Sequence, residues 1–247
     1  MTPVGDGGSD THETDALFAR WTMEGNVDDV VGELDATSNA LEFVDGIDGD
    51  AASFDGNESV TFESSPFGIC EFTISGWLRT SAQGRPGIFH LRTGVGDDYR
   101  NGGLSPYLAG GRLTFESEDL IGQTRFAADV PVNDREFHHF ALTVRPNDRL
   151  EWFIDGNPVP AAAHTEVANF QFLGLDRGAI GQRYFDGIAN NQFRGDLDDL
   201  RIVRRALGLS EIQSLIAGTS SFALMSSSES GQQPFSISTR EDEWRLW

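Results

Sequence analysis

Two neighbouring runs with alternating apolar residues constrain the fold of this chain more than any other feature. In residues 137–144 large apolar side chains stand at alternate positions 140, 142 and 144, and in residues 150–156 they stand at 150, 152 and 154. A period of two is typical of a strand with one buried face. The runs are separated by Pro146-Asn147-Asp148, and Asp155-Gly156 follows the second. Both are turn sequences, so we expect antiparallel strands here.

The same pattern recurs along most of the chain. Six Asp-Gly pairs, which favour reversals, are spread between the apolar runs. In residues 71–80, Phe72, Ile74 and Leu78 would share one face while Trp77 lies on the other, as in a central strand. Strands are expected at 16–21, 51–54, 59–62, 71–80, 87–92, 105–109, 111–116, 124–130, 137–144, 150–154, 179–181 and 199–203. This spacing predicts an all-β, two-layer antiparallel sandwich, since a parallel sheet would need crossover helices.

The chain divides into one large domain with two flanking segments. Residues 1–15 are small, polar and acidic, and are interpreted as a leader or linker. Residues 16–218 form the predicted domain, which ends in one short helix opened by a capping box at Ser210–Gln213. Residues 219–247 are a Ser-rich linker with a C-terminal extension. That extension is either an added edge strand or the start of a further domain.

Composition excludes several classes of partner. The net charge is −21, and all 18 basic residues are arginine. Such an acidic chain lacks the basic surface that binds nucleic acid or anionic membranes. No apolar run of about 18 residues is present to span a membrane, and no signal-peptide pattern occurs at the start. The acid excess has two readings, a saline habitat or a base-composition bias. The single cysteine, Cys70, is expected to be buried and inert.

Several strings, taken in order, carry a family resemblance. They are Trp21 with Met23-Glu24-Gly25, A-A-S-F-D-G at 51–56, F-T-I-S-G-W at 72–77, F-H-H-F-A-L-T at 137–143, W-F-I-D-G at 152–156, and F-R-G-D-L-D-D-L-R-I at 193–202 followed by Ala206-Leu207. Together they resemble the laminin-G-like jelly roll of the concanavalin A-like lectin and glucanase superfamily, with Phe137 in place of the usual Trp. The resemblance covers about residues 16–217. It implies a secreted or cell-surface recognition domain, and a chain that is one part of a larger multidomain protein.

The resemblance also implies a structural calcium ion between an early loop and the last strand. Calcium takes hard oxygen ligands, which flexible loops of Asp and Asn supply. Here the early loop offers Asn26 and Asp28, and the aspartate before the last strand is Asp198. The alternative is that Asp198 caps a turn or pairs with Arg201 or Arg204.

Two loop-like regions carry residue types suited to sugars. Carbohydrate binding on a β-sandwich uses exposed aromatic rings with amide, carboxylate or guanidinium groups beside them. The first region contains Tyr99, Arg100 and Asn101, with Tyr107 nearby, and the second contains Tyr184 and Asn190. We expect these residues to form the rim of a ligand site. The alternative is that the tyrosines close the ends of the core.

A catalytic site is not predicted. Retaining glycosidases place two carboxyl groups about 5 Å apart, and the nearest string is Glu116-Ser117-Glu118-Asp119. It lacks the residues that frame such a pair in those enzymes, and is interpreted as a solvated strand end. His138 and His139 would point to opposite faces of a strand, so they do not form a pair.

The sequence therefore predicts a non-enzymatic extracellular recognition module. Its expected partner is a carbohydrate or glycoprotein, and calcium is a possible structural ion. Two other functions stay open at this point. One is a glycoside hydrolase or polysaccharide lyase of the same superfamily, and the other is a structural spacer without a ligand.

Overall fold

The structure is a computed structural model that describes residues 16–32, 34–58, 60–93, 103–119, 122–146, 148–163, 172–185, 188–190 and 192–218. It describes the backbone alone at 118–119, 122–123, 161–163, 184–185 and 188–190. None of the described helices is long and apolar enough to cross a membrane.

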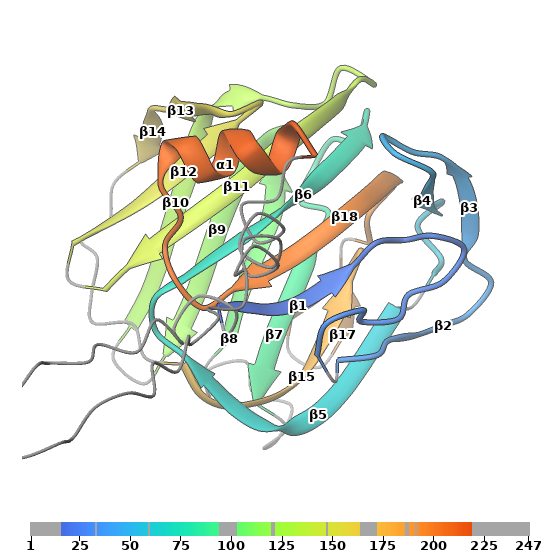
Figure 1. Ribbon diagram of the computed structural model, residues 1–247, viewed down its shortest axis with the longest axis horizontal. Helices are drawn as coiled ribbons and strands as arrows, with labels where there is room; N and C mark the ends of the chain where they lie inside the picture. Colours follow the sequence, from blue (N-terminus) through green and yellow to red (C-terminus); the bar gives the residue numbers. More distant parts are fainter. Residues whose placement is uncertain are drawn as a thin grey trace, which may run out of the picture.

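Two eight-stranded antiparallel sheets pack face to face (Figure 1). In spatial order, sheet A contains β13 (Asn157–Val159), β12 (Arg149–Ile154), β11 (Phe137–Arg145), β6 (Phe72–Thr80), β18 (Gly195–Val203), β4 (Asp50–Phe54) and β3 (Glu42–Asp45), and β1 (Leu17–Trp21) also pairs with β18. Sheet B contains β14 (Ala161–Ala163), β10 (Gly122–Pro131), β9 (Arg112–Asp119), β8 (Gly103–Ala109), β7 (Phe89–Thr93), β15 (Phe172–Ile180), β5 (Val60–Ile69) and β2 (Thr37–Ser38). A separate hairpin consists of β16 (Arg183–Phe185) and β17 (Ile188–Asn190).

The core lies between the sheets and is rich in aromatic rings. Trp21, Phe62 and Phe89 form one cluster, with ring centroids 5.4 to 6.0 Å apart. The indole N–H of Trp152 is buried but donates to the Phe126 carbonyl at 3.1 Å, so its burial leaves no unsatisfied hydrogen-bond donor. As predicted for β6, Phe72 and Leu78 are buried, while Trp77 lies on the outer face of sheet A and is half-buried. The two-layer antiparallel fold is thereby confirmed.

Helix α1 (Leu209–Ile216) covers part of the outer face of sheet A (Figure 1). Its buried side chains Ile212 and Leu215 pack in a second small core with Ala141 of β11 and Phe153 of β12. The predicted capping box is wrong in detail. The cap residue is Gly208, whose N–H donates to the carboxylate of Glu211 at 2.7 Å, so neither Ser210 nor Gln213 has that role.

Two other expectations differ from the structure. Cys70 is exposed, because it lies in the turn between β5 and β6 and not in either strand. The strand expected at 179–181 is the end of β15, which begins at Phe172. Register shifts on both sides of Leu175 interrupt its alternation of buried and exposed residues, and this hides the strand in the sequence.

Candidate functional site

The outer face of sheet B carries a row of polar side chains that crosses several strands. Thr61 of β5 and His90 of β7 both lie opposite Ala179 of β15, so the three residues share one face. On the next strands, Ser105 lies opposite Glu116, and Glu116 lies opposite Arg125. The pairing register therefore gathers residues that are far apart in the sequence.

Glu116 is the centre of this face. Its carboxylate is buried and accepts hydrogen bonds from Arg125 Nη2 at 2.7 Å and Nε at 3.0 Å, and from the Tyr107 hydroxyl at 3.2 Å. The guanidinium of Arg183 donates to the other carboxylate oxygen. The same guanidinium lies 4.0 Å from the centre of the Tyr107 ring, a cation–π geometry. The expectation of a solvated strand end is thus wrong for Glu116.

A glycine explains how Arg183 reaches this position. The segment that leads into β16 crosses directly over Gly87, which forms a bridge with Tyr107. A Cβ atom at Gly87 would lie 2.4 Å from the Gln182 carbonyl carbon and 2.5 Å from the Arg183 nitrogen. Any side chain at position 87 would therefore displace the backbone that carries Arg183.

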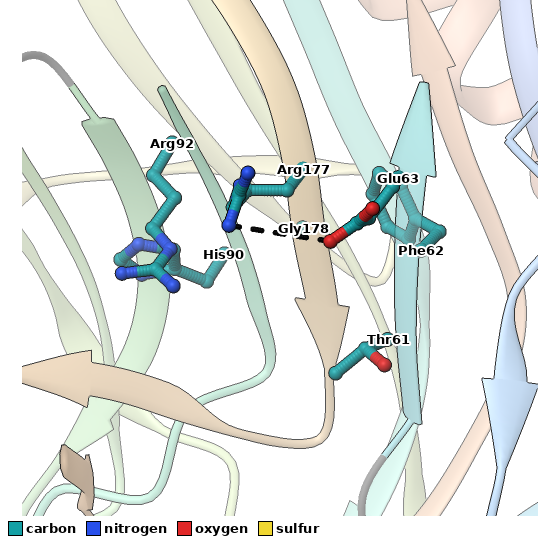
Figure 2. A pocket seen from close by; sticks show the side chains of 7 residues that line it. All are labelled: Thr61, Phe62, Glu63, His90, Arg92, Arg177 and Gly178. Atoms are coloured by element: carbon teal, nitrogen blue, oxygen red, sulfur yellow. Dashed lines mark ion pairs between the residues drawn. The ribbon is translucent and has the colours of Figure 1, made fainter. Parts of the chain in front are cut away.

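Beside this network lies a pocket of about 230 Å³ (Figure 2). His90 and Arg92 line one side of it, Thr61 and Glu63 line the other, and Arg177 lies between them. Arg177 lies 3.3 Å from Asp176 and 4.0 Å from Glu63, so its guanidinium is held by carboxylates from two strands. The pocket thus combines planar guanidinium donors with an imidazole and a hydroxyl.

Charge and burial fix the protonation states at this face. Burial, with Arg92 and Arg183 nearby, lowers the pKa of His90 to about 3, so the imidazole is neutral at pH 7. Burial also raises the pKa of Tyr107, and the Glu116 carboxylate acts in the same direction. The hydroxyl of Tyr107 therefore keeps its proton and donates a hydrogen bond to Glu116.

The ligand residues expected from the sequence have different outcomes in the structure. Tyr107 is fully buried, so the expectation of an exposed ring there is wrong; its ring lies beneath Arg183. Tyr184 and Asn190 belong to the β16–β17 hairpin, of which the structure describes only the backbone at these positions. Tyr99, Arg100 and Asn101 lie outside the described residues.

The expected calcium ligands lie in separate environments. Asn26 and Asp28 are exposed, and the Asn26 side-chain oxygen accepts the Asp28 N–H at 3.0 Å. Asp198 is buried and instead accepts the Ile47 N–H at 2.8 Å. The described residues contain no group of three or more Asp, Glu, His or Cys side chains placed to hold a metal ion. The predicted ligand set is therefore not assembled.

A different first-loop residue approaches Asp198. Glu24 accepts the Asp50 N–H at 3.1 Å and lines the same pocket as Asp198. The turn between them is tightly packed, since a Cβ atom at Gly46 would lie 2.6 Å from Asp198 Oδ2 and 2.8 Å from the Asp50 carbonyl oxygen. Burial, together with Asp199 and Glu24, raises the pKa of Asp198 to about 6, although the Ile47 N–H partly offsets this. Two carboxylates and a carbonyl are hard oxygen donors, the kind that calcium prefers.

The ion pair with Arg201 that the alternative interpretation expects for Asp198 is made by Asp199 instead. Asp199 accepts hydrogen bonds from Arg20 Nε at 2.7 Å and from Arg201 Nε at 3.1 Å. Its backbone has a φ of 46°, at a shift in the pairing of β18 with β6. Such a left-handed conformation is strained in a residue other than glycine, and strained residues concentrate at functional sites.

Comparison with known proteins places this architecture in a family. The fold is a jelly-roll sandwich with polar sites on its outer faces. Residues 54–213 match the family Laminin_G_3, described as the Concanavalin A-like lectin/glucanases superfamily. The match covers more than half of the chain, so the protein belongs to this family. No curated protein matches the chain.

Several solved structures share the fold. Domain 4 of AbnA, a GH43 extracellular arabinanase from Geobacillus stearothermophilus, in complex with arabinotriose, is 18% identical with a TM-score of 0.62, covering 81% of this chain and 98% of that domain. The binding domain of Paraclostridial Mosquitocidal Protein 1 is 19% identical with a TM-score of 0.63, and 83% of this chain covers 52% of it. A SAP-like pentraxin from Limulus polyphemus is 15% identical with a TM-score of 0.52, covering 66% of this chain and 76% of the pentraxin. At these identities the likeness concerns the fold alone.

Proposed function

We propose that this protein is a non-enzymatic recognition module that binds a glycan, free or on a glycoprotein, at the outer face of sheet B. The observation that carries the proposal is the pocket lined by His90, Arg92 and Arg177 beside the Glu116 network. Sugars present many hydroxyl groups in fixed directions, and fixed planar donors and acceptors recognise them. The arabinotriose complex of domain 4 of AbnA and the binding domain of the mosquitocidal protein are in keeping with this function.

The state of Glu116 favours binding over hydrolysis. A retaining glycosidase needs two carboxyl groups about 5 Å apart, one of them free to give and take a proton. Among the described side chains on this face, Glu116 is the only buried carboxylate. Two guanidinium groups and a phenol engage its two oxygens, so this carboxylate positions Arg125, Arg183 and Tyr107.

Calcium forms a second part of the proposal. We assign it to the carboxylates of Glu24 and Asp198 and the carbonyl of Asp50, in place of Asn26 and Asp28. When bound, the ion would neutralise two neighbouring carboxylates and connect the first loop with the last strand. A secreted or cell-surface location, within a larger multidomain protein, completes the proposal.

Glycan-array binding, followed by calorimetry on the strongest ligand, tests the proposal. We expect Arg177→Ala to weaken binding by at least about tenfold, equivalent to about 1.4 kcal/mol. The matched control is Arg149→Ala on sheet A, which removes exposed ion pairs with Asp148 and Glu151 and should bind normally. Incubation should leave the ligand uncleaved. Failure of every glycan to bind, or equal binding by Arg177→Ala, would contradict the proposed site.

A further inference from the structure

A larger pocket, of about 370 Å³, lies on the opposite side of the sandwich, on the outer face of sheet A. It is bounded by β1, the turn after β3, strands β6 and β18, and the end of helix α1. Its lining includes Trp77, Leu215 and Ile216 together with the charged residues Arg20, Asp199 and Arg201. Among all the residues that line the pocket, the sequence predicts a ligand role for Asp198 alone, as a calcium ligand.

Trp77 is the largest side chain in this pocket. It lies in a row across three strands, since it is directly opposite His139 of β11 and Asp198 of β18. The His139 ring meets the indole edge-on, with centroids 5.2 Å apart, and fixes its orientation. On the helix side, Leu215 and Ile216 add an apolar surface. The pocket is therefore apolar on two sides.

The remaining lining is charged and internally paired. Arg20 and Arg201 both bind the strained Asp199, which places two guanidinium groups at the rim. The lining carries two positive charges against the four negative charges of Glu24, Asp48, Asp198 and Asp199, a net charge of −2. This balance disfavours an anionic ligand.

Three buried polar atoms on the same face lack a hydrogen-bond partner within the described structure. They are the Thr143 hydroxyl and, nearer to Trp77, the Ser75 hydroxyl and His139 Nδ1. Ser75 is two residues before Trp77 and lies opposite Arg201, so the atoms of Ser75 and His139 belong to the face on which the pocket opens. Buried polar groups are nearly always satisfied, so a missing partner indicates a group that the protein itself does not supply. Burial, with Arg201 nearby, lowers the pKa of His139 to about 4, so this ring is a neutral donor or acceptor at pH 7.

We propose that this pocket is a second binding site, which takes one neutral sugar residue with its apolar ring face against Trp77. A pyranose has an apolar C–H face for the indole and an edge of hydroxyl groups for Asp199, Arg201 and the ordered water that reaches Ser75 and His139. The site is on the other sheet from the Arg177 pocket, so it stands or falls separately from the glycan site proposed there, although it shares Glu24 and Asp198 with the proposed calcium site. A chain with two sugar sites would bind polyvalent glycans with increased avidity.

Nuclear magnetic resonance of the full chain, labelled with ¹⁵N, tests this proposal. The indole N–H signal of Trp77 is identified as the one lost in Trp77→Phe. We expect it to shift saturably with at least one neutral methyl glycoside, at a dissociation constant on the order of 1–10 mM. Glucuronate is the comparison ligand and should shift it less, since the negative net charge of the lining disfavours an anion. Calcium alone is added as a further arm, to separate metal binding from sugar binding.

Two variants complete the experiment. Ile216→Phe narrows the pocket from the helix side without touching the charged residues, and should reduce the shift at least about fivefold. Arg177→Ala, on the other sheet, should leave the Trp77 shift unchanged. The proposal is overturned if no neutral glycoside moves the Trp77 signal, if glucuronate moves it more, or if Ile216→Phe binds like the wild type.

Discussion

Replacing Glu116 with glutamine tests the network that organises the outer face of sheet B. The side chain of Glu116 is 8% exposed and that of Arg183 2%, whereas Arg125 is 44% exposed. After Glu116→Gln, Arg125 can turn toward water, but Arg183 must keep its buried charge beside a neutral amide. Removing one partner of a buried ion pair costs about 3–5 kcal/mol. Because only one of the two cations stays trapped, we expect a loss of about 3 kcal/mol.

Urea unfolding, followed by circular dichroism, measures this loss in the free energy of unfolding. Urea is uncharged, so it does not screen the ion pair as a salt would. The control is Glu151→Gln, whose carboxylate is 30% exposed and pairs with Arg145 and Arg149. Exposed pairs contribute about 0–1 kcal/mol, so this variant should stay near the wild type. The double variant Glu116→Gln/Arg183→Met should recover part of the loss, since the trapped charge is gone. A Glu116→Gln variant within 1 kcal/mol of the wild type would refute the reasoning.

Three further predictions concern pH, calcium and the backbone. His90 and His139, with pKa values lowered to about 3 and about 4, stay neutral when folded, so their stabilisation is complete above pH 6.5 and is lost as pH falls. The pKa of Asp198, raised to about 6, acts in the opposite direction, because below that pH the folded carboxyl holds one proton more than the unfolded one. Near pH 5 the three groups together take up one net proton on unfolding, so the free energy of unfolding falls by about 1.4 kcal/mol for each unit by which the pH is lowered; a free energy of unfolding that does not fall as the pH is lowered would contradict this. Calcium should raise the melting temperature of the wild type and of Asp28→Asn but not of Asp198→Asn, and equal responses would reject the Glu24–Asp198 assignment. Gly87→Ala should cost about 1–3 kcal/mol through the clash with Gln182 and Arg183 and should weaken glycan binding. Gly84→Ala, with nothing within 4 Å but a φ of +88°, should lose stability through backbone strain and yet bind the glycan normally.

The fold was predictable because burial leaves a local record in the sequence. In β6 the alternation of Phe72 and Ile74 with the outward Trp77 fixes both faces, and Asp155-Gly156 adopts the positive φ values that its turn requires. Strand β15 was shortened in the prediction because shifts at Leu175 break the period that would reveal it. The sequence therefore predicts the strands correctly wherever the alternation of buried and exposed residues is uninterrupted.

The sites were less visible, because sheet register assembles them. Glu116 meets Arg183 across 67 residues, and no local pattern connects the two. Its position in β9 resembled a solvated end because the sequence does not reveal which segment covers a strand. Glu24 carries a usable signal, since it lies in the Met23-Glu24-Gly25 string that marks the first strand, but the amide and carboxylate oxygens of Asn26 and Asp28 make the following loop the stronger candidate in the sequence. Trp77 and Asp198 also had to be placed on one row before they could indicate a pocket.

Mapping a bound glycan onto the backbone is the most direct test of the recognition surface proposed for sheet B. With the strongest array ligand added to ¹⁵N-labelled protein, the account predicts that amide shifts concentrate at Thr61–Glu63, His90–Arg92 and Arg177–Ala179, the three strands that form the pocket. Shifts confined to the edge strands β3 and β13, with these segments unmoved, would contradict it.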